Sequence, residues 1–343
     1  MSQKVYVGMS GGVDSSVTAA LLKQQGFDVT GVYMKNWSED FPGFICPWQE
    51  DYLDAKRVAV ELGITFKLFD FEKQYRHKVV NYMVSEYQAG RTPNPDVMCN
   101  QEVKFKLFLD TSIEDGAELI ATGHYARIND GQLLTGLDPS KDQSYFLYRV
   151  TAEALRKSLM PIGEYHKSQV RVIAKKLKLY TADKKDSQGI CFVGKVGIKE
   201  FLLNELGPQT AGPILDQEGK EIGQHDGAIF YTIGQRHGLQ VGGGLPYYVT
   251  HKNIKNNSVS VTTNLDDPEL WHKEISLRDI HWINVSPQKN KSYLARLRYR
   301  GPLVPCSINK NKLILNDEQR GLAAGQSAVI YDGEICLGGG IMS

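Results

Sequence analysis

A glycine- and serine-rich stretch near the start of the chain, Ser10 to Ser16, most constrains what the protein can fold into. It follows the uncharged run Val5 to Met9, whose β-branched and aromatic residues are typical of a short buried strand. Apolar residues then recur at helical spacing until Gly26, at Val13, Val17, Ala20 and Leu21. A strand, a tight turn and a helix together aim backbone N–H groups at one point. The sequence therefore predicts an anion-binding loop that opens an α/β fold.

The residues of this loop suit a bound phosphate. Gly11 and Gly12 let the backbone approach closely because they carry no Cβ. Ser10, Ser15 and Ser16 supply hydroxyl groups, and Asp14 is placed to hold Mg²⁺. The stretch contains neither Gly-Lys-Ser/Thr nor Gly-x-Gly-x-x-Gly, which excludes the Walker loop and the dinucleotide fingerprint. The alternative is a plain Gly/Ser turn between a core strand and a core helix.

The run Ser-Gly-Gly-Val-Asp-Ser resembles the PP-loop of the ATP pyrophosphatases. The resemblance implies that ATP is used with Mg²⁺, that the loop grips the leaving pyrophosphate, and that the product is an adenylated oxygen. It also implies that Met34 lies over the adenine, although a core methionine is the alternative. The nucleotide-binding residues it implies are Gly8, Met9, Ser10, Gly11, Gly12, Val13, Asp14, Ser15, Met34 and Gly123.

Strands and helices alternate through the first third of the chain. Residues 29–34, 64–69 and 119–125 have the pattern of buried strands, and residues 71–89 that of a long helix. This order predicts a doubly wound parallel sheet whose ligand site lies at the carboxyl ends of the strands. Asp130-Gly131 predicts a hairpin turn.

Two of the five cysteines stand out. Pro93 and Pro95 predict a stiff extended loop, after which a helix is expected to begin at Asn100. Cys99 would then sit at a helix N-terminus, where the dipole lowers a thiol pKa, and Asp96 could shuttle a proton. The alternative is a buried small hydrophobe. Cys191 follows a Lys-rich, Gly-bearing loop that could present it to a partner.

Several further motifs, in the same order, resemble those of the tRNA-specific 2-thiouridylase family. They are Asn-Pro-Asp-Val-Met-Cys-Asn, Ala-Thr-Gly-His-Tyr-Ala-Arg, Lys-Asp-Gln-Ser-Tyr-Phe-Leu and Asp-Ser-Gln-Gly-Ile-Cys-Phe. The resemblance implies 2-thiolation of the wobble uridine of lysine, glutamate and glutamine tRNAs. Cys191 would carry a persulfide from a sulfur-relay protein, Cys99 would act as nucleophile, and Asp96 as acid–base. The tRNA contacts it implies are Asn94, Pro95, Asp96, His124, Lys141, Asp142, Gln143, Arg298, Tyr299 and Gln326.

The composition divides the chain into three parts. We expect a PP-loop catalytic domain over residues 1–196, a small β-rich domain over 197–272, and a C-terminal β-barrel over 273–343 that contacts tRNA. Arg296, Arg298 and Arg300 are expected on one face of a strand, as a phosphate-contacting surface or as edge-strand charges. A helix over 166–178 aligns four basic residues that could contact RNA or be plain solvated surface: Lys167, Arg171, Lys175 and Lys178.

The overall composition limits which partners, metal sites and cellular locations are expected. The net charge of +1 provides no general attraction for nucleic acid, so an RNA surface must consist of local patches. The few, irregularly spaced cysteines argue against a zinc site, so no protein-only metal site is expected. The expected location is the cytoplasm, without a leader segment or membrane contact. The alternatives are an amide-forming ligase with the same loop and an ATP-gated tRNA-binding module.

Overall fold

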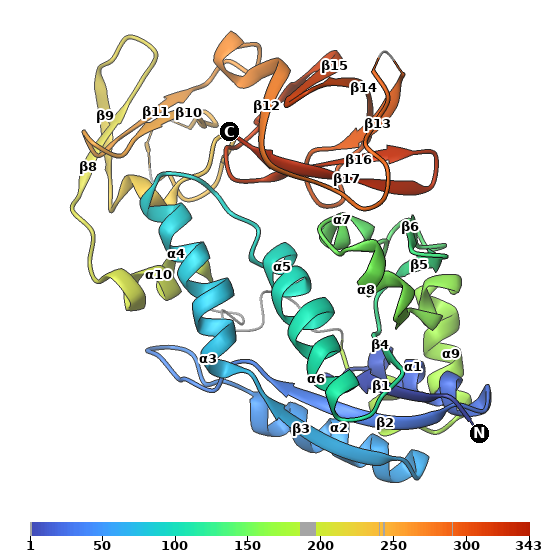
Figure 1. Ribbon diagram of the computed structural model, residues 1–343. Coiled ribbons are helices and arrows are strands. Elements are labelled where there is room, and N and C mark those ends of the chain that lie inside the picture. The colour runs from blue at the N-terminus through green and yellow to red at the C-terminus, as the bar shows by residue number, and fades with distance from the viewer. Residues whose placement is uncertain (1, 186–196, 240, 243, 290) are drawn as a thin grey trace.

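A computed structural model describes residues 2–185, 197–239, 241–242, 244–289 and 291–343 (Figure 1). It contains a parallel α/β unit, a small mixed sheet and a barrel, which confirms the predicted fold class. Figure 1 shows the parallel sheet at one end of the molecule, the barrel at the other, and helices between them. In the part of the chain that is described, no helix is long and apolar enough to cross a membrane.

The first unit is built on five parallel strands in the order β3-β2-β1-β4-β7. The strands are β1 (Lys4–Gly8), β2 (Asp28–Lys35), β3 (Thr65–Asp70), β4 (Leu119–Ala121) and β7 (Ser158–Leu159). In β1, Val5 and Val7 point to one face and Tyr6 to the other, as the period of two requires. The chain order reverses between β1 and β4, so a ligand site is expected at the carboxyl ends of these strands.

Helices cover both faces of this sheet. The face of Val5 and Val7 packs on α1 (Val13–Gln24), α2 (Trp48–Leu62) and α9 (Lys167–Lys176). The opposite face packs on two long helices, each interrupted by a π-helical segment. One runs through α3 (Glu72–Tyr75), η1 (Arg76–Val80) and α4 (Asn81–Gln88), and the other through α5 (Pro95–Met98), η2 (Cys99–Leu107) and α6 (Phe108–Glu114). A π-helical segment is rare and is frequently found at functional sites.

Short elements complete the first two units. They are α7 (Ser144–Leu147), α8 (Ala152–Arg156), η3 (Pro161–Glu164), η4 (Tyr180–Asp183), α10 (Ile198–Leu206) and η5 (Ala228–Phe230). The small mixed sheet has the order β10-β11-β8-β9. Its strands are β8 (Gly212–Leu215), β9 (Glu221–His225), β10 (Tyr248–Asn253) and β11 (Ser258–Thr262), followed by η6 (Pro268–Leu270).

The C-terminal unit is a closed six-stranded barrel. Its strands are β12 (Trp271–Trp282), β13 (Tyr293–Arg296), β14 (Leu303–Asn309), β15 (Lys312–Arg320), β16 (Ser327–Asp332) and β17 (Ile335–Met342). Pairing of β12 with β17 closes the barrel. This pairing requires glycine at position 338, where φ is +131° and a Cβ would lie 2.1 Å from the carbonyl oxygen of His281 on β12.

The barrel sheet extends into the first unit. The predicted hairpin at Asp130-Gly131 joins β5 (Ala126–Asn129) to β6 (Gln132–Thr135). Strand β6 pairs with β17 through Leu133 and Leu134. A hairpin from within residues 1–196 therefore forms the edge of the C-terminal sheet.

The prediction that Arg296, Arg298 and Arg300 share one strand is wrong, because the strand is shorter than expected. Strand β13 ends at Arg296, and the next residues form a turn in which the N–H of Gly301 donates to the carbonyl of Arg298 at 2.9 Å. Arg300 has a φ of +58° in this turn. Arg298 and Arg300 are exposed, whereas Arg296 is mostly buried. Gly301-Pro302 breaks the alternation on which the prediction depended.

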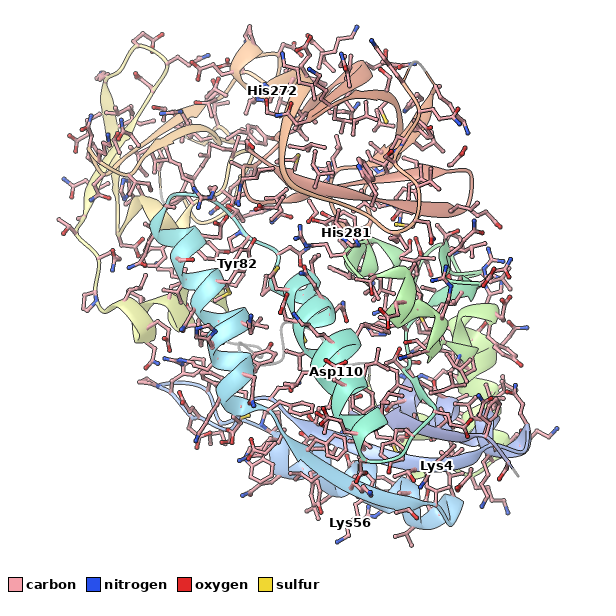
Figure 2. All side chains as sticks on the ribbon, viewed as in Figure 1. Lys4, Lys56, Tyr82, Asp110, His272 and His281 are labelled. Atoms are coloured by element: carbon pink, nitrogen blue, oxygen red, sulfur yellow. The ribbon has the colours of Figure 1, made fainter. Side chains whose placement is uncertain are left out.

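A buried carboxylate joins helix α4 to the barrel. Glu86 on α4 accepts two hydrogen bonds from Arg91, at 2.6 and 2.8 Å, and one from Arg278 on β12. Burial opposes ionisation, but the two arginines outweigh it and hold the pKa of Glu86 below its usual range. Tyr82, labelled in Figure 2, lies one turn earlier on the same helix, and burial raises its pKa to about 12. His281 of β12, also labelled there, lies where the barrel faces α7.

Replacing Glu86 by Gln should destabilise the protein by about 2 kcal/mol near neutral pH, measured by urea unfolding. The loss is kept moderate because Arg91 and Arg278 retain 35% and 31% exposure and stay partly hydrated. Since the folded-state pKa is lowered, the stabilisation is present above the unfolded pKa and disappears as the pH falls through the folded one. The difference between wild type and variant should therefore shrink in acid. Glu334→Gln, at an exposed pair with Arg127, is the control and should change little.

Candidate active site

The predicted loop lies at the carboxyl end of β1 and leads directly into α1. Gly11 has a φ of +72°, and a Cβ there would lie 2.4 Å from the carbonyl oxygen of Asp51. Gly12 is the N-cap of α1, and no side chain caps this end of the helix. The hydroxyls of Ser15 and Ser16 donate to the carbonyl of Gly12 at 3.1 and 2.8 Å. The helix start therefore keeps its N–H groups for an anion, which fits a bound polyphosphate.

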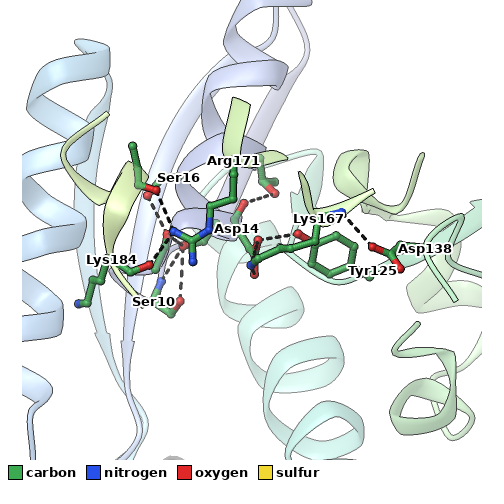
Figure 3. Close-up of polar contacts among 12 residues, drawn as sticks. Ser10, Asp14, Ser16, Tyr125, Asp138, Lys167, Arg171 and Lys184 are labelled. Carbon is green, nitrogen blue, oxygen red and sulfur yellow. Dashed lines mark hydrogen bonds and ion pairs between the residues drawn. The ribbon is translucent and has the colours of Figure 1, made fainter. Parts of the chain in front are cut away.

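The carboxylate of Asp14 is held by two side chains whose contact with it was not predicted from the sequence. Figure 3 shows Lys167 and Tyr125 converging on it. The Nζ of Lys167 lies 2.7 Å from both carboxylate oxygens, and the hydroxyl of Tyr125 donates to one of them at 2.7 Å. Lys167 was expected in a basic surface stripe, but its side chain is only 13% exposed. An ammonium beside the phosphate loop is suited to neutralise a polyphosphate as well as Asp14.

Two further residues of the expected stripe, Arg171 and Lys175, make contacts within the protein, whereas Lys178 is exposed. Arg171 donates to the carbonyls of Ala182 and Lys184, at 2.8 and 2.6 Å. Lys175 pairs with Asp183 at 3.1 Å. Arg171 and Lys175 thus hold residues 182–184 against α9, which gives the helical spacing of these two basic residues a structural explanation.

The predicted adenine side of the site lies where strands β1 and β2 end. A Cβ on Gly8 would lie 3.0 Å from the terminal methyl of Met34, which places these two residues in contact range. Met9 donates its N–H to the carbonyl of Val32 at 2.8 Å and is buried. Met34 itself remains partly exposed at the end of its strand. These positions suit an adenine pocket.

Residues Thr122–Tyr125 join the phosphate loop to the cysteine helix. A Cβ on Gly123 would lie 2.8 Å from the N atom of Ser15, so this glycine lets β4 run directly against the start of α1. Tyr125 holds Asp14, as described. Between them, His124 turns the other way, and its Nε2 lies 3.5 Å from the Nζ of Lys104 on η2.

His124, which the family resemblance places at the tRNA, is a buried neutral side chain. Burial, assisted by the charge of Lys104, lowers the pKa of His124 well below its usual value. Because an ammonium has only donors, Nε2 accepts from Lys104, and the Nδ1–H donates to the hydroxyl of Thr122 at 2.8 Å. The ring also packs against Phe105, with centroids 5.7 Å apart.

The prediction that Cys99 opens a helix is wrong. The helix begins four residues earlier, with Asn94 as N-cap and Pro95 in the first turn. Asn-Pro is itself a favourable helix start, since proline needs no donor there. Cys99 begins the π-helical segment, is 4% exposed, and packs in the hydrophobic core, as the alternative interpretation described. The helix dipole falls off within the first turn, so it provides no argument for a reactive thiol at this position.

Asp96 lies in the first turn of this helix and is partly buried. Removal from water raises the pKa of its carboxyl, and the charge of Lys104 acts in the opposite direction. A carboxyl with a raised pKa holds a proton more readily than an ordinary aspartate, which suits a general acid–base. Cys191 lies outside the described residues.

The loop before Asp96 is fixed by the barrel. The amide of Gln326 donates to the carbonyl of Thr92 at 2.8 Å, and the N–H of Thr92 donates to the carbonyl of Ala324 at 2.8 Å. A Cβ on Gly325 would lie 2.8 Å from Thr92. Gln326, expected to touch tRNA, thus connects two units of the protein. Asn94 likewise uses its side chain to cap α5, accepting from Val97 at 3.4 Å.

The Lys141–Gln143 stretch is partly structural. Asp142 is buried and accepts from Arg296 at 2.7 Å, and Gln143 accepts from the N–H of Tyr125 at 2.9 Å. Lys141 instead faces a cavity of about 500 Å³, together with Arg296 and Arg300. Tyr299 packs on Phe146, with ring centroids 4.3 Å apart. Basic groups from two units thus line one hollow, which suits a phosphate group.

Comparisons with known proteins place the chain in a class and then in a family. Residues 3–195, 199–263 and 272–342 match the families described as tRNA methyl transferase HUP domain, tRNA methyl transferase PRC-barrel domain and aminomethyltransferase beta-barrel domain. With the parallel sheet, its phosphate loop and the barrel, these matches define a multidomain protein of the tRNA-modifying class.

Two curated relatives are 46% identical to it, and both are named tRNA-specific 2-thiouridylase MnmA. The relative from Bordetella avium matches over 99% of this chain and 97% of its own, and the one from Francisella philomiragia over 99% of both. The chain belongs to the tRNA-specific 2-thiouridylase family. A solved 4-thiouridine synthetase–RNA complex with bound ATP is 17% identical, covers 60% of this chain and 50% of its own, and has a TM-score of 0.36, too low to support an argument.

Replacing Gly11 by Ala should abolish ATP binding and destabilise the protein by about 2 kcal/mol, because the new Cβ meets backbone at a positive φ. Calorimetric titration with ATP and thermal unfolding would measure the two effects. Gly12→Ala is the control for stability, since its Cβ would meet only the Ser10 hydroxyl at 3.5 Å. Equal unfolding temperatures for the two variants would contradict the assigned loop conformation.

Proposed function

We propose that the protein thiolates C2 of the wobble uridine in tRNA, with ATP as co-substrate and a cysteine persulfide as sulfur source. Family membership supports the reaction class. The observation that carries the proposal for this chain is segment Thr122–Tyr125, which contacts the phosphate loop at Ser15 and Asp14 and the cysteine helix at Lys104. Adenylation and sulfur transfer would therefore take place in one continuous site.

In the first step, O2 of the uracil attacks the α-phosphorus of ATP and pyrophosphate leaves. The N–H groups at the start of α1 would hold the pyrophosphate, and Lys167 would balance its charge. Asp14 is the carboxylate that would hold Mg²⁺, whose charge would stabilise the leaving group. Uracil O2 becomes a good nucleophile only when the N3 proton departs, and Asp96 is the base that would take it.

In the second step, the terminal sulfur of a Cys191 persulfide attacks C2 and AMP leaves. The Cys99 thiolate then attacks the Sγ of Cys191, which forms a Cys99–Cys191 disulfide and releases the C2 thiocarbonyl. The alternative order, in which Cys99 first releases sulfide that attacks C2, gives the same products. In both orders two thiols supply the two electrons that reduce the transferred sulfur, so a dithiol must reduce the disulfide before the next turnover.

The partners follow from this chemistry. A sulfur-relay protein would load Cys191, and the lysine, glutamate and glutamine tRNAs would be the substrates, in the cytoplasm. The exposed turn that holds Arg298 and Arg300, together with Lys141, would contact the tRNA backbone. The pocket of the target base would be shaped by Asn94, Pro95, Asp96, His124 and Tyr299. Because His124 is buried, it would act by supporting the residues around it.

The reaction is tested with cysteine variants, by mass spectrometry of tRNA nucleosides and by pyrophosphate release. Wild type with ATP, tRNA and a persulfide donor should form 2-thiouridine. Cys191→Ser should release pyrophosphate but carry no persulfide, and Cys99→Ser should load sulfur yet form no thionucleoside. Cys306→Ser, in the barrel core, is the control and should retain activity. Full turnover in the double variant of Cys99 and Cys191 would favour an amide-forming ligase, and absence of pyrophosphate release from wild type would favour a binding module.

Reversing charge at Arg298 and Arg300 to Glu should weaken tRNA binding and reduce the slope of log affinity against log salt by about 1.5, because each phosphate contact releases counterions. ATP affinity should not change. Lys310→Glu with Lys312→Glu makes the same charge change on exposed positions elsewhere on the barrel and should have a smaller effect. Equal tRNA affinity of both double variants would exclude the 298–301 turn as an RNA surface.

A further inference from the structure

Two side chains of different kinds bind the carboxylate of Asp14, and the proposed reaction uses only one of them. The Nζ of Lys167 on α9 lies 2.7 Å from both carboxylate oxygens (Figure 3). The hydroxyl of Tyr125 donates to Oδ1 alone, at 2.7 Å. Lys167 is assigned to the charge of the leaving pyrophosphate, whereas Tyr125 has no role in that reaction. The two partners therefore differ in charge and in how much of the carboxylate they occupy.

The position of Asp14 suits a cation that a bound phosphate carries. Asp14 lies in the first turn of α1, beside N–H groups that no side chain caps, and its side chain is 30% exposed. A phosphate on those N–H groups would bring its Mg²⁺ close to the carboxylate, whose oxygens are ligands that Mg²⁺ prefers. Because Lys167 contacts both oxygens, its ammonium must withdraw from at least one of them to admit the metal.

Lys167 is able to make this move. Its ammonium is a compact charge on a flexible four-carbon stem, so it can reach a new partner without any shift of α9. An ammonium and a metal ion on one carboxylate repel each other, and the phosphates of ATP offer the ammonium an anionic alternative. Charge therefore favours the transfer of Lys167 from Asp14 to the nucleotide.

Tyr125, in contrast, is fixed by packing and by its backbone. Its ring is 3% exposed and packs in the hydrophobic core beneath α1 and α9. The N–H of Tyr125 donates to the side-chain carbonyl of Gln143 at 2.9 Å, and the N–H of Gln143 donates to the carbonyl of Tyr125 at 2.9 Å. An uncharged hydroxyl is not repelled by a metal ion, and this one occupies only Oδ1. Asp14 would thus keep one fixed contact when the ammonium leaves.

We propose that Tyr125 is a positioning residue that holds the carboxylate of Asp14 in place for Mg²⁺ while Lys167 moves from Asp14 to the phosphates of ATP. This inference rests on the proposed function and adds to it the residue that orients its metal ligand. The hydroxyl of Tyr125 stays protonated and continues to donate to Oδ1, so no proton is transferred. Without this hydrogen bond, the carboxylate would be free to turn about its own side-chain bonds and to follow Lys167.

The experiment measures, by calorimetric titration, the affinity for α,β-methylene ATP, which cannot release pyrophosphate. The titration is made with EDTA and with saturating Mg²⁺, and the ratio of the two affinities is the Mg²⁺ enhancement. Tyr125→Phe should lower the enhancement about tenfold, the effect of one hydrogen bond to a charged group. Its affinity in EDTA should stay near that of wild type, whereas a merely structural loss would weaken both affinities together.

Lys167→Met provides a second arm with the opposite sign. Binding in EDTA should weaken, because the nucleotide loses a cation, and the Mg²⁺ enhancement should rise, because no ammonium competes for Asp14. This arm decides the outcome if Tyr125→Phe does not fold, since an enhancement that does not rise would then overturn the inference.

Tyr33→Phe is the matched control. Tyr33 packs in the same core, is 7% exposed, and its hydroxyl donates to the carbonyl of Trp48 at 3.0 Å, so this variant also loses one hydroxyl contact. Its enhancement should equal that of wild type. An unchanged enhancement in folded Tyr125→Phe, an equal fall in Tyr33→Phe, or a wild type without any enhancement would overturn the inference. A wild type that shows the enhancement but forms no 2-thiouridine would instead contradict the proposed function.

Discussion

The structure depends on the close approach of the end of β4 to the start of α1. Gly123 permits this approach, since any Cβ would collide with the backbone at Ser15. From this point the chain sends Tyr125 to Asp14 and His124 to Lys104, in opposite directions. The reversal of strand order between β1 and β4 provides a crevice at the carboxyl ends of these strands. Tyr125 and His124 connect the phosphate loop on one side of it to the cysteine helix on the other.

The barrel supports this site through one backbone contact, one side-chain amide and one buried ion pair. The turn at 323–326 meets the loop at Thr92, and Gln326 closes the contact from the barrel side. Glu86 with its two arginines fixes the neighbouring helix against β12. The loop that leads into the helix of Asp96 and Cys99 is thus held by the barrel, and the helix itself packs in the hydrophobic core. Positional precision at the reacting groups depends on such external support.

The sequence predicted the parallel sheet, the phosphate loop and the barrel because each has a local pattern of hydrophobic period and glycine placement. The prediction failed where contacts between residues far apart in the sequence determine the local structure. Lys167 looked like surface because helical spacing does not reveal that its side chain crosses to Asp14, 153 residues earlier in the chain. The start of the Cys99 helix was misplaced because two prolines were interpreted as an extended loop, although Asn94-Pro95 is also a helix start. The π-helical segment has no sequence signature, so the contact between Lys104 and His124 could not be predicted.

The hairpin β5–β6 has a consequence for how the chain can be divided. Together with β5, strand β6 forms the edge of the C-terminal sheet, although both strands precede α9 and the whole second unit in the sequence. A fragment that stops before the barrel would leave the Leu133–Leu134 backbone without its partner strand, and the isolated barrel would leave Ile335 and Cys336 of β17 without their β6 neighbours. The pairing of β6 with β17 therefore crosses the boundaries expected from the sequence. Slow amide exchange should extend through β6 and β17 as one cooperative unit, opening together and not domain by domain.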